Sequence, residues 1–202
     1  MSNTGKPFSQ ASENNKTPIL ACLTAAFANV DDVLEIGSGT GQHAVHFAAN
    51  LPQLIWQTSD LEENHTGIRA WLEHAALENL RQPLLLDVSR RPWPQSRASA
   101  IFSANSLHIM SWQSVEQFFY GVGEVLDPAG QLCVYGPFNY DGRYTSESNA
   151  RFDQWLKARD PRSGIRDFEA ISKLAQAQGL SLVEDHALPA NNRLLHWQLA
   201  PA

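Results

Sequence analysis

The sequence predicts an α/β fold in which a mostly parallel, seven-stranded sheet lies between two layers of helices. Two observations predict it: short apolar segments alternate with amphipathic ones along most of the 202 residues, and the last two apolar segments are joined by only a few residues. Parallel strands need long crossover connections, usually helices, so this alternation is typical of a parallel sheet. The closely joined final pair predicts an antiparallel strand at the C-terminal end of the chain.

The predicted strands are short, apolar and bounded by turn-forming residues. They are residues 32–36, 54–60, 83–88, 100–107, 131–138, 180–188 and 192–200. The predicted helices carry apolar residues three and four positions apart. They are residues 17–27, 42–51, 67–80, 112–126, 146–158 and 167–178. In the first helix, Thr17 is the expected N-cap and Pro18 the first helical residue, which leaves residues 1–16 as a polar, irregular segment.

The composition favours a single domain, residues 1–202, that is soluble and cytoplasmic. Hydrophobic residues make up 43% of the chain, enough for one full core, and neither repeats nor low-complexity linkers divide it. The net charge of −6 argues against a general nucleic-acid-binding protein. No apolar run approaches the roughly 18 residues of a membrane span, and the polar first residues lack the core of a signal peptide. Cys22 and Cys133 are expected to be free thiols.

Three glycines, Gly37, Gly39 and Gly41, stand directly behind the first predicted strand. Glycine at a strand-to-helix turn permits a positive φ and lets a ligand approach the backbone without meeting a Cβ. In a dinucleotide-binding turn the third small residue would stand at position 42, which is glutamine here. The alternative is a tight turn that binds nothing, but a position at the carboxyl end of a parallel strand favours a ligand site.

Acidic residues end the next two predicted strands. Asp60 ends the second strand, 21 residues after Gly39, where a carboxylate can accept hydrogen bonds from both hydroxyls of a ribose. Asp87 stands at the end of the third strand. Each acid alone could instead cap a helix or lie in solvent. Together with the glycines, at the carboxyl ends of successive strands, they predict one ligand-binding crevice.

Glu35 followed by glycines at positions 37, 39 and 41 resembles motif I of the class I S-adenosylmethionine-dependent methyltransferases, which have a three-layer Rossmann-like fold. The resemblance covers about residues 17–202 and implies S-adenosyl-L-methionine as the cofactor. The cofactor-binding residues that it implies are Glu35, Gly37, Gly39, Gly41, Asp60, Leu61, Asp87 and Val88. It implies ribose beside Asp60, the adenine amine beside Asp87, and apolar cover from the residue after each acid. The segments SANSLHIMSW and YGPFNYDGRYTSESNARFD further resemble a small methyltransferase-like family known mainly as a domain of unknown function.

The loops after the fourth and fifth strands supply the expected acceptor side. Methyl transfer requires an aligned nucleophile, exclusion of water and, where necessary, removal of a proton. His108 is the first candidate for a general base because its imidazole titrates near neutral pH; the alternative is that it caps or packs against the following helix. The expected catalytic residues are His108, Asn105 and Tyr140, and the expected substrate-binding residues are Asn15, Asn192 and Phe138.

The three asparagines of this set are far apart in the sequence. We expect Asn15, Asn105 and Asn192 to converge with His108 and Tyr140 on one pocket at the carboxyl edge of the sheet, where amides can orient a polar acceptor. Each asparagine also has the simpler interpretation of a helix cap or turn residue. Asn105 and Asn192 at opposite ends of the sheet would contradict the shared pocket.

Residues 138–155 are unusually rich in polar and aromatic side chains for a connector, and could form a lid over the substrate. Arginine and lysine outnumber acids between residues 143 and 166. A solvated helix face is the ordinary explanation, but an inward cation would favour an anionic small molecule. No metal site is expected, because the seven histidines and two cysteines lack the short ligand spacing of a zinc site. His43 and His46 are expected to be surface or packing residues.

These observations favour a methyltransferase that uses S-adenosyl-L-methionine and acts on an unidentified small molecule. One alternative is a catalytically silent cofactor-binding module that acts through a partner. A nicotinamide-dependent oxidoreductase is a weaker alternative, because of Gln42 and the lack of an evident Tyr-x-x-x-Lys pair. Neither nucleic acid nor a membrane is an expected partner, and the sequence gives no indication of the oligomeric state.

Overall fold

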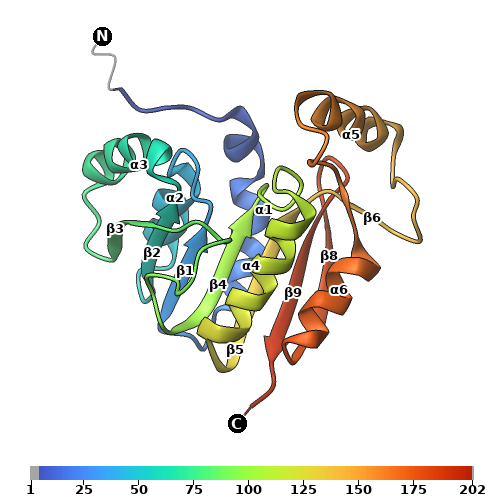
Figure 1. Cartoon of the computed structure of the whole chain (residues 1–202). Helices are drawn as coiled ribbons and strands as arrows, with labels where there is room; N and C mark the ends of the chain where they lie inside the picture. Colours follow the sequence, from blue (N-terminus) through green and yellow to red (C-terminus); the bar gives the residue numbers. More distant parts are fainter. Residues whose placement is uncertain (1–4, 202) are drawn as a thin grey trace.

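A seven-stranded sheet forms the centre of the molecule, in the order β3-β2-β1-β4-β5-β9-β8 (Figure 1). The computed structural model describes residues 5–201. The strands are β1 (Asp32–Ile36), β2 (Ile55–Asp60), β3 (Leu80–Leu85), β4 (Ala98–Ala104), β5 (Leu126–Gly136), β8 (Leu180–Leu188) and β9 (Asn192–Leu199). β9 runs antiparallel to β5 and β8, whereas the other neighbouring strands are parallel. The predicted fold class is confirmed.

Helices cover both faces of the sheet, and one helix lies beyond its end. They are α1 (Gln10–Ala26), α2 (Gln42–Asn50), α3 (Glu62–Ala75), α4 (Trp112–Val125), α5 (Glu147–Arg159) and α6 (Phe168–Ala177). α1 and α2 pack together on one face with α3 beside them, and α4 and α6 lie on the other face, toward the viewer in Figure 1. α5 lies past the carboxyl ends of the parallel strands, at the end of the sheet where α1 begins (Figure 1). The short strands β6 (Phe138–Asn139) and β7 (Arg166–Asp167), one on each side of α5 in the chain, pair separately from the main sheet.

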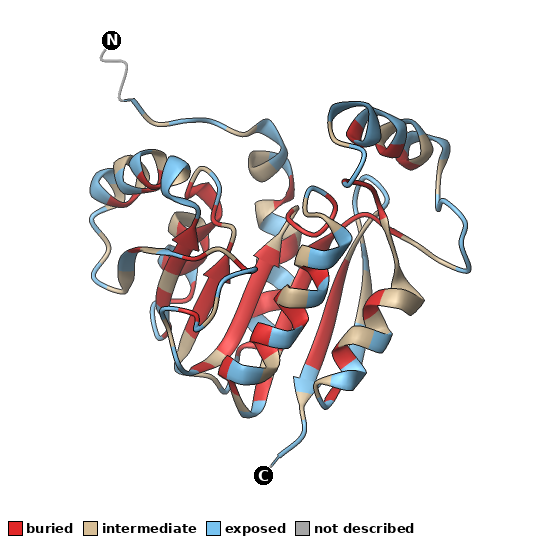
Figure 2. Ribbon diagram, in the orientation of Figure 1, coloured by how far each residue is buried: buried red, intermediate tan, exposed pale blue. Residues whose placement is uncertain are grey.

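Each face of the sheet has its own apolar core, because successive residues of a strand point to opposite sides. On β4, Ile101 belongs to the core under α4 and α6, whereas Phe102 belongs to the core under α1 and α2. Phe102 contacts Phe47 and Trp56 there, with ring centroids 5.4 and 5.9 Å away. The central strands are accordingly buried along most of their length, and the exposed residues lie mainly on the outer faces of the helices and in the loops (Figure 2).

The first helix begins earlier than predicted, and the assignment of Thr17 as its N-cap is wrong. Ser9 caps the helix by accepting a hydrogen bond from the Ser12 amide at 3.2 Å, and Pro18 lies inside it. Residues 10–16 are therefore helical rather than irregular. A proline inside a helix removes one backbone hydrogen bond, so the preceding turns must gain stability from other contacts.

Those contacts come from α2 and α3. The Ser9 amide donates a hydrogen bond to the Gln42 Oε1 at 2.5 Å, and the Trp71 indole donates one to the Pro7 carbonyl at 2.7 Å. The Lys6 ammonium also lies 4.4 Å from the Trp71 ring centroid. The segment before α1 is thus fixed across two neighbouring helices, which holds Ser9 at the carboxyl edge of the sheet.

Two strands end earlier than predicted, which lengthens the loops at this edge. β3 ends at Leu85 rather than at residue 88, and β4 ends at Ala104 rather than at residue 107. Asp87 and residues 105–107 therefore stand in loops, where the backbone can bend toward a ligand.

Cys22 and Cys133 are free thiols, the first half-buried and the second buried. Burial raises the pKa of both, so neither forms a reactive thiolate at neutral pH. Within residues 5–201, no helix is both long enough and apolar enough to cross a membrane.

Candidate functional site

A cavity of about 920 Å³ opens at the carboxyl ends of β1, β2 and β4. The strand order reverses between β1 and β4, which makes this the switch point at which open α/β sheets bind ligands. The wall consists of the glycine turn, the loops after β2, β3 and β4, the start of α1 and one face of α5. The predicted site residues that line it are Gly37, Gly39, Asp60, Leu61, Asp87, Val88, Asn105 and His108.

The three glycines of the turn have three different environments. At Gly39, φ is +59° and a Cβ would meet no atom within 4 Å, so this backbone borders open cavity space. At Gly41, φ is +89° and a Cβ would stand 3.1 Å from the Ile68 Cα, so this glycine lets α2 pack closely against α3. A Cβ at Gly37 would stand 2.6 Å from the Ser106 Oγ. Gly39 is therefore the position that a ligand can approach most closely, whereas Gly41 is not on the cavity wall.

Glu35 lies beneath the glycine turn and does not line the cavity. Its Oε2 accepts hydrogen bonds from the Ser38 hydroxyl at 2.8 Å and from the Trp56 indole at 3.1 Å. The Ser38 hydroxyl in turn accepts a hydrogen bond from the Ser59 amide at 3.2 Å. Burial raises the pKa of Glu35 to about 7, although its two hydrogen-bond donors act in the opposite direction. Glu35 thus fixes the conformation of the turn instead of contacting a ligand directly.

Asp60 joins the glycine turn to the end of β2. Its Oδ2 accepts a hydrogen bond from the Gly39 amide at 2.7 Å, and its Oδ1 accepts from the Leu61 amide at 2.7 Å and the Asn64 amide group at 2.8 Å. A carboxylate has about four acceptor positions, so one remains, on Oδ2. Asp60 alone therefore has too few free positions to bind both hydroxyls of a ribose.

Asn64 is a cavity-lining residue that the sequence prediction missed. Its Nδ2 donates to Asp60, and its Oδ1 accepts no hydrogen bond from residues 5–201, so a second acceptor stands beside the first. The signal was its position one helical turn after Asp60. The predicted helix begins at residue 67, which leaves Asn64 outside it, whereas α3 begins at Glu62.

Asp87 lies on the cavity wall after β3. Its Oδ1 accepts hydrogen bonds from the Ser89 amide at 2.9 Å and the Ser89 hydroxyl at 2.6 Å. These bonds, chiefly that of the hydroxyl, together with the nearby Arg90 guanidinium lower the pKa of Asp87. An ionised acceptor thus stands at this end of the cavity, where the buried Val88 and the half-exposed Leu61 also line the wall.

The loop after β4 holds the predicted acceptor-side residues Asn105 and His108. Asn105 has a φ of +57°, and its amide donates a hydrogen bond to the Tyr135 carbonyl at 2.9 Å. His108 is buried, and its carbonyl accepts a hydrogen bond from the Gly164 amide at 2.9 Å. Burial, and to a smaller extent the charge of Arg166, lower the pKa of His108 to about 4. The imidazole is therefore neutral near pH 7 and has a ring nitrogen that can accept a hydrogen bond, although burial makes it a weaker base than an exposed histidine.

Tyr140 and Phe138 do not line the cavity. The Tyr140 hydroxyl donates a hydrogen bond to the Asp185 Oδ2 at 2.7 Å, and its ring stacks on Phe168 with centroids 5.1 Å apart. Phe138 is 1% exposed and belongs to the core under α4 and α6. The chain turns away from the cavity after β5 to pair β6 with β7, and this corrects the prediction that both aromatic rings face the acceptor.

Asn15 and Asn192 meet at Tyr135 rather than at His108. Both amides lie beside the Tyr135 hydroxyl and lower its pKa, against the burial that raises it. Asn15 also shares a hydrogen bond with the His43 Nε2 at 2.7 Å. Asn105 and Asn192 both stand at the carboxyl end of β5, so they share one edge of the sheet, but the predicted single pocket is divided into a cavity and this buried polar cluster.

His43 connects the polar cluster to the cavity. Its position fits a packing residue rather than a surface one, because it is buried and stacks on Phe47 with ring centroids 5.3 Å apart. It also lines the cavity, which the sequence does not indicate. Burial lowers its pKa to about 4, so its imidazole is neutral near pH 7. His46, one helical turn away from the cluster, is half-buried beside the same phenylalanine.

One face of α5 forms the outer wall of the cavity. It contributes Phe152, Trp155, Leu156 and Arg159. The helix is held in place by the buried Asp153, whose carboxylate accepts a hydrogen bond from the Ile165 amide at 2.7 Å. Of the segment predicted as a lid, residues 138–155, only Phe152 and Trp155 line the cavity, and whether they cover a substrate stays a prediction.

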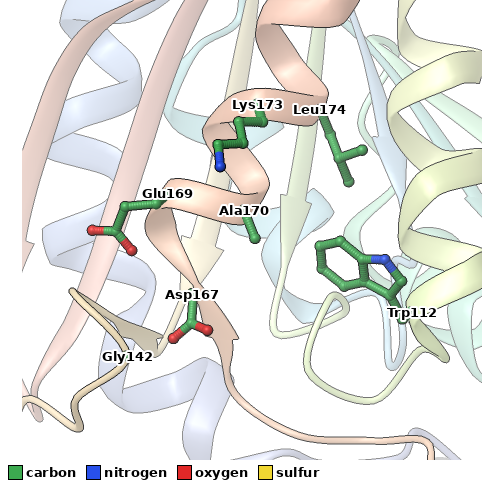
Figure 3. A pocket seen from close by; sticks show the side chains of 7 residues that line it. All are labelled: Trp112, Gly142, Asp167, Glu169, Ala170, Lys173 and Leu174. Carbon is green, nitrogen blue, oxygen red and sulfur yellow. The ribbon is translucent and has the colours of Figure 1, made fainter.

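A second, smaller cavity of about 380 Å³ lies at the beginning of α6, beside the first residue of α4 (Figure 3). Its lining residues are Trp112, Gly142, Asp167, Glu169, Ala170, Lys173 and Leu174. None of the predicted site residues is among them. Residues 5–201 contain no group of three or more histidine, cysteine or acidic side chains placed to bind a metal ion, and this includes the walls of both cavities.

The family described as "Protein of unknown function (DUF938)" matches residues 6–199 of the chain. That match covers the whole sheet, both layers of helices and every residue of the cavity wall. The family description assigns no activity, so it leaves the function to be argued from the site.

Solved structures of methyltransferases share this fold. An O-methyltransferase family protein from Burkholderia thailandensis matches with a TM-score of 0.84 and 17% identity, over 95% of this chain and 58% of that one. SibL, an S-adenosylmethionine-dependent methyltransferase in its apo form, matches with a TM-score of 0.80 and 22% identity, over 95% and 56%. Human N-acetylserotonin methyltransferase, in complex with SAM, matches with a TM-score of 0.77 and 14% identity, over 95% and 53%.

At these identities the likeness is one of fold. The chain has the class I methyltransferase fold, and it spans little more than half the length of each of these three proteins. Activity and ligands must therefore be argued from the residues of its own cavity.

Proposed function

We propose that this chain, which belongs to the DUF938 family of proteins of unknown function, transfers a methyl group from S-adenosyl-L-methionine to a small molecule. The observation that carries the proposal is the joint position of Gly39, Asp60 and Asp87 on one cavity at the switch point of the sheet. The methyltransferase fold supports it. A cavity of about 920 Å³ lies at the upper end of the range for small-molecule sites, so it has room for a nucleoside and an acceptor together.

The residues at one end of the cavity fit this cofactor. The open backbone at Gly39 would lie against its methionine part. The free acceptor positions of Asp60 and Asn64 would each take one ribose hydroxyl, in place of the expected pairing of both hydroxyls with Asp60. The ionised Asp87 would accept from the adenine amine, and the Val88 side chain would cover one face of the ring.

The other end of the cavity fits an acceptor that loses a proton. When bound, the cofactor supplies an electrophilic methyl carbon, so the chain must align the acceptor and remove its proton. His108 is neutral near pH 7 and would take that proton on a ring nitrogen. Asn105, three residues earlier in the same loop, would orient the acceptor through its amide. Phe152 packs edge-on against His108 at 5.3 Å, and with the rest of α5 it would exclude water from the reacting groups.

Two measurements test the proposal. In calorimetry, S-adenosylhomocysteine should bind in preference to NAD, and a preference for NAD would favour a nicotinamide-dependent oxidoreductase instead. Labelled S-adenosyl-L-methionine incubated with a fractionated metabolite pool should then yield a labelled small molecule. Binding of S-adenosylhomocysteine without transfer to any fraction would favour a cofactor-binding module.

A further inference from the structure

The cavity face of α5 carries two aromatic rings and one cation in a continuous stack. Phe152, Trp155, Leu156 and Arg159 follow the spacing of a single helix face, and all four line the cavity. The Phe152 and Trp155 rings are stacked with centroids 5.8 Å apart and 17° between their planes. The Arg159 guanidinium lies 4.7 Å from the Trp155 ring centroid. This stack extends from the loop that carries His108 to the end of the helix.

Part of the apolar surface at this end of the cavity is exposed. Trp155 is 51% exposed, and Ile109, in the loop after β4, adds a second large apolar side chain that is 59% exposed. Both line the cavity. A flat apolar ligand would remove this surface from water, at about 25 cal/mol for each Å² covered. The exposed Trp155 ring, stacked on Phe152, therefore suits a ligand with a planar aromatic body.

Arg159 gives this end of the cavity an uncompensated positive charge. It is the one arginine or lysine among the described residues that line the cavity. Asp160 lines the same end, but its carboxylate is already engaged by the Arg162 guanidinium, at 3.0 and 2.9 Å. No described carboxylate lies within ion-pair distance of Arg159. A guanidinium binds a carboxylate through two parallel hydrogen bonds, so Arg159 is suited to an anionic group on the ligand.

The opposite end of the cavity has the opposite charge. Asp60, Glu63 and Asp87 line the wall near the glycine turn and the loops after β2 and β3. A ligand with a negative group is repelled there and attracted to the α5 end. The charges thus give the cavity a direction, with the nucleoside at the acidic end and an anionic acceptor at the basic end.

We propose that the methyl acceptor is a hydroxylated aromatic carboxylic acid, an inference that rests on the proposed methyltransferase function. Its ring would lie along Phe152 and Trp155, and its carboxylate would pair with Arg159. In the transfer, a bond forms between the hydroxyl oxygen and the methyl carbon while the carbon–sulfur bond breaks. The bonding pair stays on sulfur, and the hydroxyl proton passes to a ring nitrogen of His108. Because His108 and Arg159 stand at the two ends of the aromatic stack, the hydroxyl and the carboxylate lie at opposite ends of the acceptor.

The experiment uses the full chain saturated with S-adenosylhomocysteine and a panel of matched ligands. The panel contains para-hydroxylated benzoic, phenylpropionic and cinnamic acids, the corresponding hydroxynaphthoic acids, and the neutral amide of each. At least one acid should bind about tenfold or more tightly than its amide, the range expected for hydrogen bonds to a charged group. Arg159→Gln should remove that preference, and Arg159→Lys should keep part of it. Trp155→Ala should weaken binding of the acid and the amide alike.

Arg151→Gln is the matched control. Arg151 lies on the same helix but outside the cavity wall, and its guanidinium stands 3.7 Å from the Glu147 carboxylate. It should leave the preference for acids unchanged. Equal affinity for acids and amides, or no binding by any member of the panel, would overturn the inference while S-adenosylhomocysteine still binds. The inference would also be overturned if Arg159→Gln lowered the affinity for S-adenosylhomocysteine itself, because the guanidinium would then bind the cofactor's own carboxylate. Failure of S-adenosylhomocysteine to bind the unaltered chain would contradict the proposed function first.

Discussion

The two ends of the cavity are held in place by different forces. At the glycine turn, Glu35, Ser38 and Asp60 are at most 8% exposed, and each forms hydrogen bonds to its neighbours. At the α5 end, Trp155 and Ile109 are 51% and 59% exposed, and their side chains form no hydrogen bond to any residue that the structure describes. One end is built from backbone and buried polar groups, and the other from side chains that stand on the surface of a helix and a loop.

This difference determines what a ligand must do at each end. The glycine turn is already ordered, so a ligand there pays little to organise the protein. Exposed, flexible side chains lose about 0.5–1.5 kcal/mol each when a ligand immobilises them, so the α5 end depends on the ligand for its order. Substitutions at the first end should therefore change the stability of the protein and the cofactor affinity together, whereas those at the second should change acceptor binding and leave the cofactor affinity unchanged.

The largest effect is expected from Gly39→Val. Valine resists a φ of +59°, and its side chain would enter the cavity space into which the Gly39 backbone opens. We expect S-adenosylhomocysteine binding to weaken by about two orders of magnitude or more, which corresponds to about 3 kcal/mol. Calorimetry measures this, with circular dichroism to show that the variant folds.

Gly142→Val is the control for backbone strain. Gly142 has a similar φ of +67°, and a Cβ there would likewise meet no atom within 4 Å, but this glycine lies outside the main cavity. The variant should lose a similar amount of stability and keep its affinity for S-adenosylhomocysteine. Folded Gly39→Val with unchanged affinity would mean that the turn is structural only.

Glu35→Gln should change how stability depends on pH. The pKa of Glu35 is raised to about 7 in the folded protein, above the ordinary value of 4.5. Between these values the folded chain holds a proton that the unfolded chain has lost, so the free energy of unfolding falls as pH rises. The fall amounts to about 3 kcal/mol and is complete above about pH 7. Glutamine keeps an acceptor for Ser38 and Trp56 without a charge.

Urea denaturation of both proteins between pH 4.5 and 8 measures this difference. Wild type and variant should have similar stability near pH 4.5, and the variant should become progressively more stable toward pH 7. His43 and His108 act in the opposite direction, because their folded pKa values of about 4 lie below the ordinary 6.5 and raise stability as pH rises from 4 to 6.5. They act equally in both proteins, so they cancel in the difference. Parallel stability curves would contradict a buried, proton-holding Glu35.

The same contrast explains how much could be predicted from the sequence. The positions of Gly39, Asp60 and Asp87 on the cavity follow from local rules, because parallel strands bring their carboxyl ends to one edge. The seven strands and their mostly parallel arrangement follow from the alternation of apolar segments. The start of α1 could not be predicted in this way. Thr17 and Pro18 form a strong local signal for a helix start, but tertiary contacts of the preceding residues extend the helix back to Gln10.

The α5 end was less predictable, because its geometry depends on tertiary contacts. The path from β5 into β6 buries Phe138 and leads Tyr140 to Asp185, which no spacing in the sequence indicates. The composition of residues 138–155 did suggest a lid, but which side chains face the cavity is fixed by Asp153 and its hydrogen bond to the distant Ile165 amide. Periodicity alone therefore indicated a helix and not its orientation.

The smallest effect on cofactor affinity is expected from Asp60→Ala. Asp60 offers one free acceptor position to a ribose hydroxyl, and a hydrogen bond to a charged group contributes about 1.5–3 kcal/mol. S-adenosylhomocysteine binding should therefore weaken by about one order of magnitude or somewhat more. Thermal unfolding should also occur earlier, since the Gly39 and Leu61 amides lose their acceptor. Asp160→Ala is the control at the other end of the cavity: Asp160 lines the wall but pairs with Arg162, so its loss should leave the cofactor affinity unchanged. If both variants lowered the affinity for S-adenosylhomocysteine equally, the acidic end would not be the end that binds the nucleoside, and the placement of nucleoside and acceptor at opposite ends of the cavity would be wrong.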